Sequence, residues 1–501
     1  MIARPHVDWF ALAPFVCLLG AMALALFTAV LVPRSARRPV AAGLCALGYA
    51  AALGFAIALF VRSPHGFGEV GNALRRDRFA ELAQMIVAGC GLLSVAIAFR
   101  ERMSDDHVGE YYALLAAAGA GMSFFVGANN LMTLFLSLEW FSLSLYILCA
   151  IDRDLAGGLE AALKYLIIGS FGSAVLLFGS ALVYGETGHI DFSGIAAANQ
   201  SHDTLLVFGL AMIIAGLGFK SSAAPFHMWT PDVYEGAPTP VTAFMAAATK
   251  TVALLVMLRV LTTAFPQEAH LWTVAVAVLA VTSLVIGNLA ALVQRNVKRM
   301  LAYSSISQAG FMLIAISADS ALGTRALLFY LFVYAAMSLG AFAVVAARER
   351  ELGAPVTLDS LAGFGWERPF LGLSMWAFVL GFAGFPLTGG FIAKFYVFSA
   401  AYEHGWTWLV IVGVIATLVS LYYYLAIVRA MYMRRTEDRQ LAPRTELAAQ
   451  PTATVAIGGS PPRELVLQTA VATCLVVTVG SFFAVQPLID LCTHAASSLT
   501  F

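Results

Sequence analysis

The stretch Lys220-Ser-Ser-Ala-Ala-Pro225-Phe-His227-Met-Trp229 decides the fold class, because it ends a long apolar run that begins near residue 204. Such a run can cross a bilayer, which needs about 20 apolar residues in a helix. Proline removes an intrahelical hydrogen bond, so the stretch predicts a membrane helix that is broken beside a lysine. Irregular backbone at membrane depth is tolerated where it faces protein or a water-filled cavity. The break therefore favours polar access to Lys220.

The composition of the whole chain is that of a polytopic membrane protein in contact with a lipid bilayer. The 501 residues are 60% hydrophobic and 12% charged, with a mean hydropathy of +0.83. Average soluble domains carry about 25% charged residues. The net charge of zero gives no electrostatic support for a nucleic-acid partner. The six cysteines form no CxxC pair, so the sequence predicts no metal and no iron–sulfur site in this chain.

Fourteen apolar segments of sufficient length follow one another along the chain. They lie at residues 9–32, 40–61, 79–99, 111–127, 130–151, 161–184, 204–228, 238–262, 271–293, 299–317, 324–347, 369–400, 406–433 and 464–490. We therefore expect an all-α polytopic membrane protein of about 14 transmembrane helices. Helices 4–8 and 9–13 could form two five-helix repeats, which would be inverted because each has an odd number of helices.

These segments divide the chain into five predicted parts. They are an N-terminal three-helix segment (1–110), a first five-helix repeat (111–262), a second (271–433), a cytoplasmic linker (434–463) and a C-terminal helix (464–501). The linker begins charged and continues through prolines and glycines, which is typical of a flexible connection. The last helix therefore looks like an appendage to the repeats.

The basic residues of the loops predict the orientation in the membrane. Of the 29 lysines and arginines, 18 lie in odd-numbered loops and 7 lie in the N-terminus and the even-numbered loops. Cytoplasmic loops carry the excess of positive charge, so both termini are expected to face away from the cytoplasm. The split also favours an even number of helices. The cluster Arg75, Arg76 and Arg78 in the second loop goes against this assignment.

Four of the five lysines lie inside apolar segments, whereas the arginines cluster between the segments. These four are Lys164, Lys220, Lys250 and Lys394. A lysine at membrane depth costs roughly 2.5–3.5 kcal/mol on insertion scales, so it is rarely accidental. Unlike arginine, lysine can lose its proton when it is desolvated. The distribution predicts a protein that moves protons through a membrane.

A second broken helix precedes Lys394. The residues Gly381-Phe-Ala-Gly384-Phe-Pro386-Leu-Thr-Gly389-Gly390 interrupt the twelfth segment shortly before that lysine. An ordinary proline kink would explain one such helix. Here the fourth helix of each proposed repeat carries a lysine close to a break, and this correspondence favours a function.

Glu139 lies about ten residues into the fifth helix, so it should reach a depth similar to that of Lys220 and Lys250. A glutamate and a lysine at that depth can offset each other's desolvation cost by pairing. A pair that forms and breaks could take up and release a proton. The alternative is a static ion pair that only orients helices.

Other polar residues have a structural explanation beside the functional one. His227 could relay protons because histidine titrates near neutral pH, or it could pack and bond a freed carbonyl. Lys164 lies near the start of its helix, where its stem could reach the interface. The acidic stretch at 232–235 could form a funnel or a solvated loop. The polar run at 304–308 could hold water, although hydrogen bonding between helices explains it more readily.

Three segments resemble the antiporter-like subunits of proton-pumping NADH:quinone oxidoreductase, respiratory complex I. They are residues 220–244, residues 294–308 and residues 385–396. The resemblance covers nearly the whole chain, is strongest from about 110 to 430, and is closest to the N-type subunit. The L and M types usually carry a histidine early in helix 8, where this chain has apolar residues before Lys250. The M type usually has glutamate at the position of Lys394.

The resemblance implies roles for the matching residues. Glu139 would be the glutamate of helix 5 that modulates its paired lysine, Lys220. Lys250 would be the connecting lysine of helix 8, and Lys394 the lysine of helix 12 near the exit to the far side. His227 would lie beside the break of helix 7, where it could shuttle protons.

The resemblance also implies the surroundings of the chain. It would be a non-redox subunit of the enzyme, and NAD, FMN, iron–sulfur clusters and quinone would bind to partner subunits. The partners would be other membrane subunits of complex I, especially the neighbouring antiporter-like subunit M and small membrane subunits. The location would be a bacterial inner membrane, with both termini on the periplasmic side.

Two other functions stay open on the sequence. The chain could belong to a multisubunit cation/proton antiporter, or it could be a purely structural membrane subunit whose charges hold helices together. A sodium site would want more buried oxygen ligands than the sequence offers.

Overall fold

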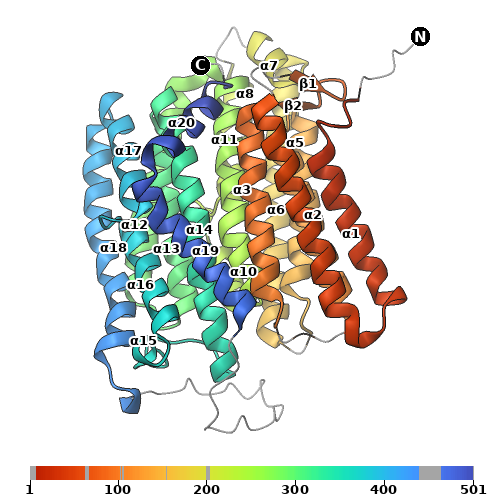
Figure 1. The fold of residues 1–501 in the computed structure, drawn as a ribbon. Helices are drawn as coiled ribbons and strands as arrows, with labels where there is room; N and C mark the ends of the chain where they lie inside the picture. Colours follow the sequence, from red (N-terminus) through yellow and green to blue (C-terminus); the bar gives the residue numbers. More distant parts are fainter. Residues whose placement is uncertain are drawn as a thin grey trace.

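The computed structural model describes residues 7–62, 67–101, 103, 106–153, 155–198, 203–438 and 464–499. They form a bundle of long helices with one small antiparallel hairpin, whose strands are β1 (Phe67–Glu69) and β2 (Leu74–Arg76) (Figure 1). The predicted all-α fold class is confirmed.

The helices follow the predicted segments closely. The first half of the chain forms α1 (Ala13–Leu31), α2 (Arg34–Arg62), α3 (Arg78–Ala98), α4 (Val108–Val126), α5 (Leu131–Cys149), α6 (Ala156–Thr187), α7 (Phe192–Ala198), α8 (Thr204–Lys220) and α9 (Trp229–Gly236). The second half forms α10 (Thr239–Phe244), a π-helical turn η1 (Met245–Thr249), α11 (Lys250–Ala264), a 3-10 turn η2 (Pro266–Glu268), α12 (Ala269–Leu292), α13 (Val297–Ser317), α14 (Ala321–Leu352), α15 (Phe364–Glu367), α16 (Pro369–Ala383), α17 (Gly389–Glu403), α18 (Thr407–Met433), a 3-10 turn η3 (Thr436–Asp438), α19 (Leu465–Phe483) and α20 (Val485–Ala496).

Eleven helical stretches in the described part of the chain are long and apolar enough to cross a membrane. Two shorter apolar helices, α8 and α16, are the first halves of the two helices that were predicted to be broken. The breaks are confirmed, because α8 ends at Lys220 and α16 ends at Ala383. The number of crossings and the inverted repeats stay predictions.

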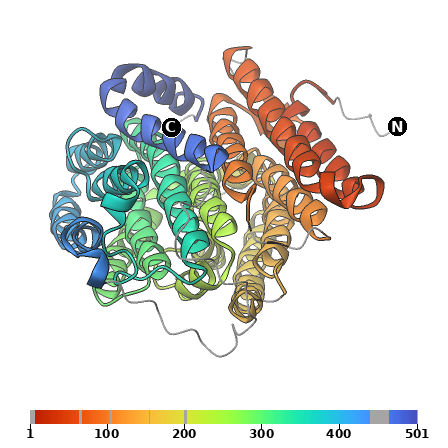
Figure 2. The ribbon, with the colours of Figure 1, turned by 60° about the horizontal axis from the view of Figure 1, so that its bottom comes forward.

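The centre of the bundle consists of α10, η1, α11, α13 and α14, whose side chains are almost all buried. Figure 2 shows α1 and α2 at one edge of the bundle and α18 at the opposite edge. The edge helices expose large apolar side chains such as Leu31 of α1 and Leu418 of α18, as expected where a helix faces lipid or another subunit. A polar group on a central helix is therefore surrounded by protein.

Both ends of the described chain lie at the same end of the bundle, next to the hairpin. Asp8 pairs with Arg76 at 3.2 Å, and the Ser498 hydroxyl accepts a hydrogen bond from the Phe79 N–H at 3.1 Å. Figure 1 shows the hairpin and α20 at one end and α15 at the other. An even number of crossings gives this arrangement. The side of the membrane that each end faces stays a prediction.

The arginines of the second loop disagree with the orientation that loop charge predicts. Each of them forms an ion pair or a hydrogen bond within the protein. Arg75 pairs with Asp77 at 3.2 Å, and Arg76 also pairs with Glu81 at 3.4 Å. Arg78 donates to the Phe60 carbonyl at 3.2 Å. These arginines serve the packing of the hairpin, which explains a basic cluster in this loop.

The C-terminal helices do not form an appendage, so this expectation was wrong. Helix α19 crosses the bundle obliquely and packs on α14, α16 and α17, and α20 then packs on α14 and α3 (Figure 1). Small and apolar side chains of α19 such as Ala470, Val471 and Cys474 are buried there. Most of the predicted linker, residues 439–463, lies outside the described residues.

Candidate functional site

Lys220 is the last residue of α8, and its side chain is buried between α5, α6 and α8. Its Nζ donates to the Ser142 hydroxyl at 2.8 Å and to the Tyr165 hydroxyl at 3.0 Å. The ammonium also lies 4.6 Å from the centre of the Phe141 ring. The negative end of the helix dipole favours a cation near the C-terminus of a helix, and α8 ends at this lysine.

Lys250 directly follows η1, a π-helical turn that the sequence did not predict. Its Nζ donates to the carbonyl oxygen of Ser305 and, at 2.6 Å, to the Ser305 hydroxyl. The Tyr334 ring lies 5.9 Å from the ammonium. Single π-helical turns occur frequently at functional sites.

Lys394 lies on α17 and points back to the end of α16. Its Nζ is 3.3 Å from the Ala383 carbonyl and 3.4 Å from the Thr417 hydroxyl, and it lies 4.1 Å from the centre of the Phe311 ring. The chain turns at Gly384, whose φ is 78°. Glycine adopts this left-handed backbone without the steric cost that a Cβ atom brings.

The three lysines share one environment. Each side chain is at most 4% exposed, and each lies at or beside an interruption of its helix. None of the three forms an ion pair with a carboxylate anywhere in the described chain; their partners are hydroxyls, carbonyls and aromatic faces. Burying a cation without a carboxylate partner costs free energy. A static ion pair that only orients helices therefore does not explain these sites.

Glu139 is half-buried on α5, one turn before Ser142. The predicted direct pair with Lys220 does not form: Lys220 uses Ser142 and Tyr165 instead, and Glu139 Oε1 has no hydrogen-bond partner within the described residues. Glu139 therefore lies one helical turn from a partner of Lys220 but does not itself contact the lysine.

His227 lies in the segment between α8 and α9, where it is half-buried. Its Nδ1 is buried and has no hydrogen-bond partner in the described part of the chain. The next aromatic residue along the chain, Trp229, stacks on Tyr165 with ring centres 4.6 Å apart. Tyr165 is a partner of Lys220, so the segment that carries His227 is connected to the Lys220 site by packing.

Lys164 differs from the other three lysines, because 41% of its side chain is exposed and it is paired with acids. Its Nζ lies 2.8 Å from Glu160 and 2.8 Å from Asp232. Asp232 also pairs with Arg299 at 2.7 Å. Partial burial raises the pKa of Asp232, but the hydrogen bonds from Lys164 and Arg299 outweigh it and hold that pKa below its usual value. The acidic stretch of α9 is thus clamped between α6 and α13.

The polar run of α13 joins neighbouring helices, as the structural alternative predicted. The Ser304 and Tyr424 hydroxyls are 2.5 Å apart, and the Gln308 amide donates to Tyr424 at 3.1 Å. Tyr334 donates to the Ser305 hydroxyl at 3.0 Å. This run lies between the Lys250 and Lys394 sites.

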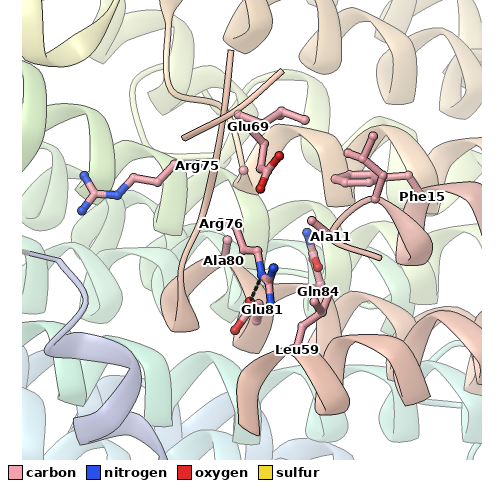
Figure 3. A pocket seen from close by; sticks show the side chains of 12 residues that line it. Ala11, Phe15, Leu59, Glu69, Arg75, Arg76, Ala80, Glu81 and Gln84 are labelled. Atoms are coloured by element: carbon pink, nitrogen blue, oxygen red, sulfur yellow. Dashed lines mark hydrogen bonds and ion pairs between the residues drawn. The ribbon is translucent and has the colours of Figure 1, made fainter. Parts of the chain in front are cut away.

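Sequence reasoning missed a buried ion pair outside the lysine sites. Asp77, the N-cap residue of α3, accepts from Arg259 of α11 at 2.5 Å, and both side chains are buried. Figure 3 shows Arg76 and Glu81 of the same region at a cavity of about 20 Å³. That volume holds about one water molecule. Eight residues of the central helix, of which all but Thr251 are apolar, separate Arg259 from Lys250, so this cluster stands apart from the lysine sites.

Together, the helical fold, the broken helices and the unpaired buried lysines define a membrane subunit of the antiporter-like class. The family described as NADH:quinone oxidoreductase/Mrp antiporter, TM matches residues 128–420. A relative named NADH-quinone oxidoreductase subunit N, from Salinibacter ruber, is 42% identical over 419 residues, which are 82% of either chain. The chain belongs to the family of NADH-quinone oxidoreductase N subunits.

Solved structures agree with this assignment. A chain of respiratory complex I from Thermus thermophilus matches with a TM-score of 0.76 and 31% identity, over 95% of this chain and 98% of that one. A chain of the Mrp complex from Dietzia sp. DQ12-45-1b matches with a TM-score of 0.83 and 22% identity, over 97% of either chain. The second likeness concerns the fold alone.

Proposed function

We propose that this chain carries protons through the membrane part of an NADH:quinone oxidoreductase, along Lys220, Lys250 and Lys394 with Glu139 as the acidic modulator. Oxidation of NADH and reduction of quinone would take place in partner subunits, which would hold NAD, FMN, iron–sulfur clusters and quinone. The chain would lie in a bacterial inner membrane beside the M-type subunit and small membrane subunits, with both termini on the periplasmic side.

The observation that carries the proposal is the shared environment of the three lysines. Their hydroxyl partners, on Ser142, Tyr165, Ser305 and Thr417, can accept a hydrogen bond from an ammonium and can donate one to a neutral amine. A hydroxyl partner can therefore form a hydrogen bond with the lysine in either protonation state, whereas a carboxylate partner would favour the charged lysine. The sites thus suit lysines that gain and lose a proton.

The role of Lys164 is smaller in this proposal. Its two acid partners and its exposure are those of an interfacial ion pair, which typically contributes little. We therefore propose that Lys164 lies at the mouth of the Lys220 site, where Asp232 and Arg299 position α9. His227 would connect that mouth to Lys220.

Alanine substitutions test the proposal in the assembled complex, reconstituted into liposomes. Lys220→Ala and Lys250→Ala should each abolish most of the proton transport that accompanies NADH oxidation, because no other titratable side chain replaces the lost station. Lys164→Ala is the matched control and should keep most of the transport. If both Lys220→Ala and Lys250→Ala pump as the wild type does, the proposal is wrong.

A further inference from the structure

Gln308 of α13 stands between the Lys250 site and the Lys394 site. On one side the Ser305 hydroxyl accepts from Lys250 at 2.6 Å and from Tyr334 at 3.0 Å. On the other side Lys394 contacts the Ala383 carbonyl and the Thr417 hydroxyl. No hydrogen bond between described residues joins these two groups directly. The side chain in the middle therefore decides whether they communicate.

The Gln308 amide is completely buried and is held by three other helices. Its Nε2 donates to the Phe382 carbonyl of α16 at 3.0 Å and to the Tyr424 hydroxyl of α18 at 3.1 Å. Its Oε1 accepts from the Tyr330 hydroxyl of α14 at 2.5 Å. A reversed amide would set Oε1 against the Phe382 carbonyl, and two acceptors cannot pair. The network thus fixes the orientation of the amide.

Gln308 and Lys394 together complete the open end of α16. The last carbonyls of a helix have no partner inside the helix. Two carbonyls of this end accept from backbone N–H groups just beyond it. The remaining two, of Phe382 and Ala383, accept from Gln308 and Lys394. Because these two side chains are bound to neighbouring carbonyls, a movement of one side chain also displaces the carbonyl to which the other is bound.

An amide cannot pass on a proton as its neighbours can. Hydroxyl groups both donate and accept, and a lysine gains or loses a proton, whereas the glutamine Nε2 only donates and its Oε1 only accepts. The hydroxyl groups of Thr417, Ser420 and Tyr424 lie on one face of α18, at helical spacing. On this face, Thr417 contacts Lys394 and Tyr424 contacts Gln308. Among the side chains described at this junction, the amide is the one that does not relay a proton.

We propose that Gln308 is a latch between the two lysine stations. While it is bound to the Phe382 carbonyl and the Tyr424 hydroxyl, Lys250 and Lys394 do not exchange a proton. When it releases them, one proton leaves Nζ of one lysine and binds to Nζ of the other, and no other group changes its charge. Gln308 is a positioning residue, and the inference rests on the proposed function of the lysines.

Gln308→Glu tests the latch, because it replaces the amide with a group of the same size that can relay a proton. The complex is reconstituted into liposomes, a membrane potential is imposed without NADH, and proton entry is followed with an internal pH dye. Gln308→Glu should let protons enter several-fold faster than the wild type. Adding Lys394→Ala to this variant should bring the entry back to the wild-type rate.

Gln84→Glu is the matched control. Gln84 is a buried glutamine of α3 that donates to the Ser123 carbonyl at 3.3 Å, away from the lysine sites. This variant should show wild-type proton entry. Equal proton entry in Gln308→Glu, Gln84→Glu and the wild type would overturn the latch.

Gln308→His keeps the test decisive if Gln308→Glu does not assemble, because histidine also relays protons and carries the same expectation. Assembly is checked by NADH oxidation with quinone. The outcome also separates the two proposals. If Lys250→Ala stops pumping but neither Gln308 variant leaks, only the latch is wrong; if Lys220→Ala and Lys250→Ala both pump normally, the proposed function is wrong as well.

Discussion

Each buried lysine is solvated by neutral groups that come from other helices. Lys220 of α8 uses Ser142 of α5 and Tyr165 of α6, and Lys250 of α11 uses Ser305 of α13. Aromatic faces at 4.1–5.9 Å add a cation–π attraction of about 0.5–2 kcal/mol. A cation held in this way is stabilised without a fixed counter-charge, so its proton can leave without leaving an unpaired carboxylate behind.

The proposed role of Glu139 as the acidic modulator of Lys220 gives a prediction at the residue scale. Glu139→Gln removes the charge of the proposed modulator and loses no hydrogen bond formed by Oε1 among the described residues, so the complex should assemble normally but pump more slowly. Proton transport per NADH oxidised, measured in liposomes, checks this.

Glu160→Gln is the control for that variant. Glu160 is exposed and pairs with Lys164 at 2.8 Å, so its loss should leave pumping near the wild-type level. Wild-type pumping in Glu139→Gln, together with impaired pumping in Lys220→Ala, would contradict a modulating role for Glu139.

At the scale of elements, three different interruptions serve the three lysines. Helix α8 stops at Lys220, α10 and α11 are joined by the π-helical turn η1, and α16 stops before the turn at Gly384. At each interruption, backbone carbonyls lose their partners in the regular helical hydrogen-bond pattern, and polar side chains can bind to them instead. The sequence marks two of these interruptions with proline and glycine, whereas residues 245–249 contain neither.

Gly384→Ala tests the element at Lys394. A Cβ at this position would lie 2.8 Å from Lys394 Cδ, and φ is 78°, so the substitution strains the backbone by about 1–2 kcal/mol and displaces the lysine. We expect an assembled complex with clearly reduced proton transport, measured beside NADH oxidation.

Gly188→Ala provides the comparison. Gly188 also ends a helix with a left-handed φ, of 70°, but nothing lies within 4 Å of its Cβ position. It should show the backbone strain without the loss of transport. Equal transport in the two alanine variants would show that the position of Lys394 does not matter.

The sequence predicted the elements of the site better than its contacts. Lysines within apolar segments, and proline and glycine beside them, are local signals, so Lys220, Lys394 and both broken helices could be identified. The partners Ser142, Tyr165 and Ser305 lie on other helices, and their approach depends on the rotation of packed helices. Hydropathy does not encode that rotation. For the same reason the sequence suggested a direct pair of Glu139 with Lys220, whereas Lys220 binds the Ser142 and Tyr165 hydroxyls instead.

At the scale of the whole molecule, a buried ion pair connects the N-terminal helices to the central one. Asp77 begins α3 and Arg259 lies on α11, so the pair joins the first three helices to the helix that carries Lys250. Arg259 also lies 5.1 Å from the Phe79 ring. The C-terminal Ser498 binds at the same place, which brings three distant parts of the chain together.

Removal of one partner should destabilise this junction strongly. Asp77→Ala leaves the Arg259 charge buried and also removes the cap of α3, which predicts a loss of about 3–5 kcal/mol. Thermal unfolding of the purified complex, or its yield on native gels, measures the effect.

The double variant Asp77→Ala/Arg259→Met removes the stranded charge and should recover part of the stability. Asp106→Ala serves as the surface control, because Asp106 pairs with arginines while half exposed. If the double variant is no more stable than Asp77→Ala, the buried charge is not the cause.

The central claim is that the buried lysines act by losing and regaining a proton. The most direct measurement is the number of protons transported per NADH oxidised by the complex with Lys250→Arg, because arginine keeps the positive charge but does not release its proton. The account predicts a clearly lower ratio than in the wild type, in a complex that still assembles and oxidises NADH. An unchanged ratio would contradict it.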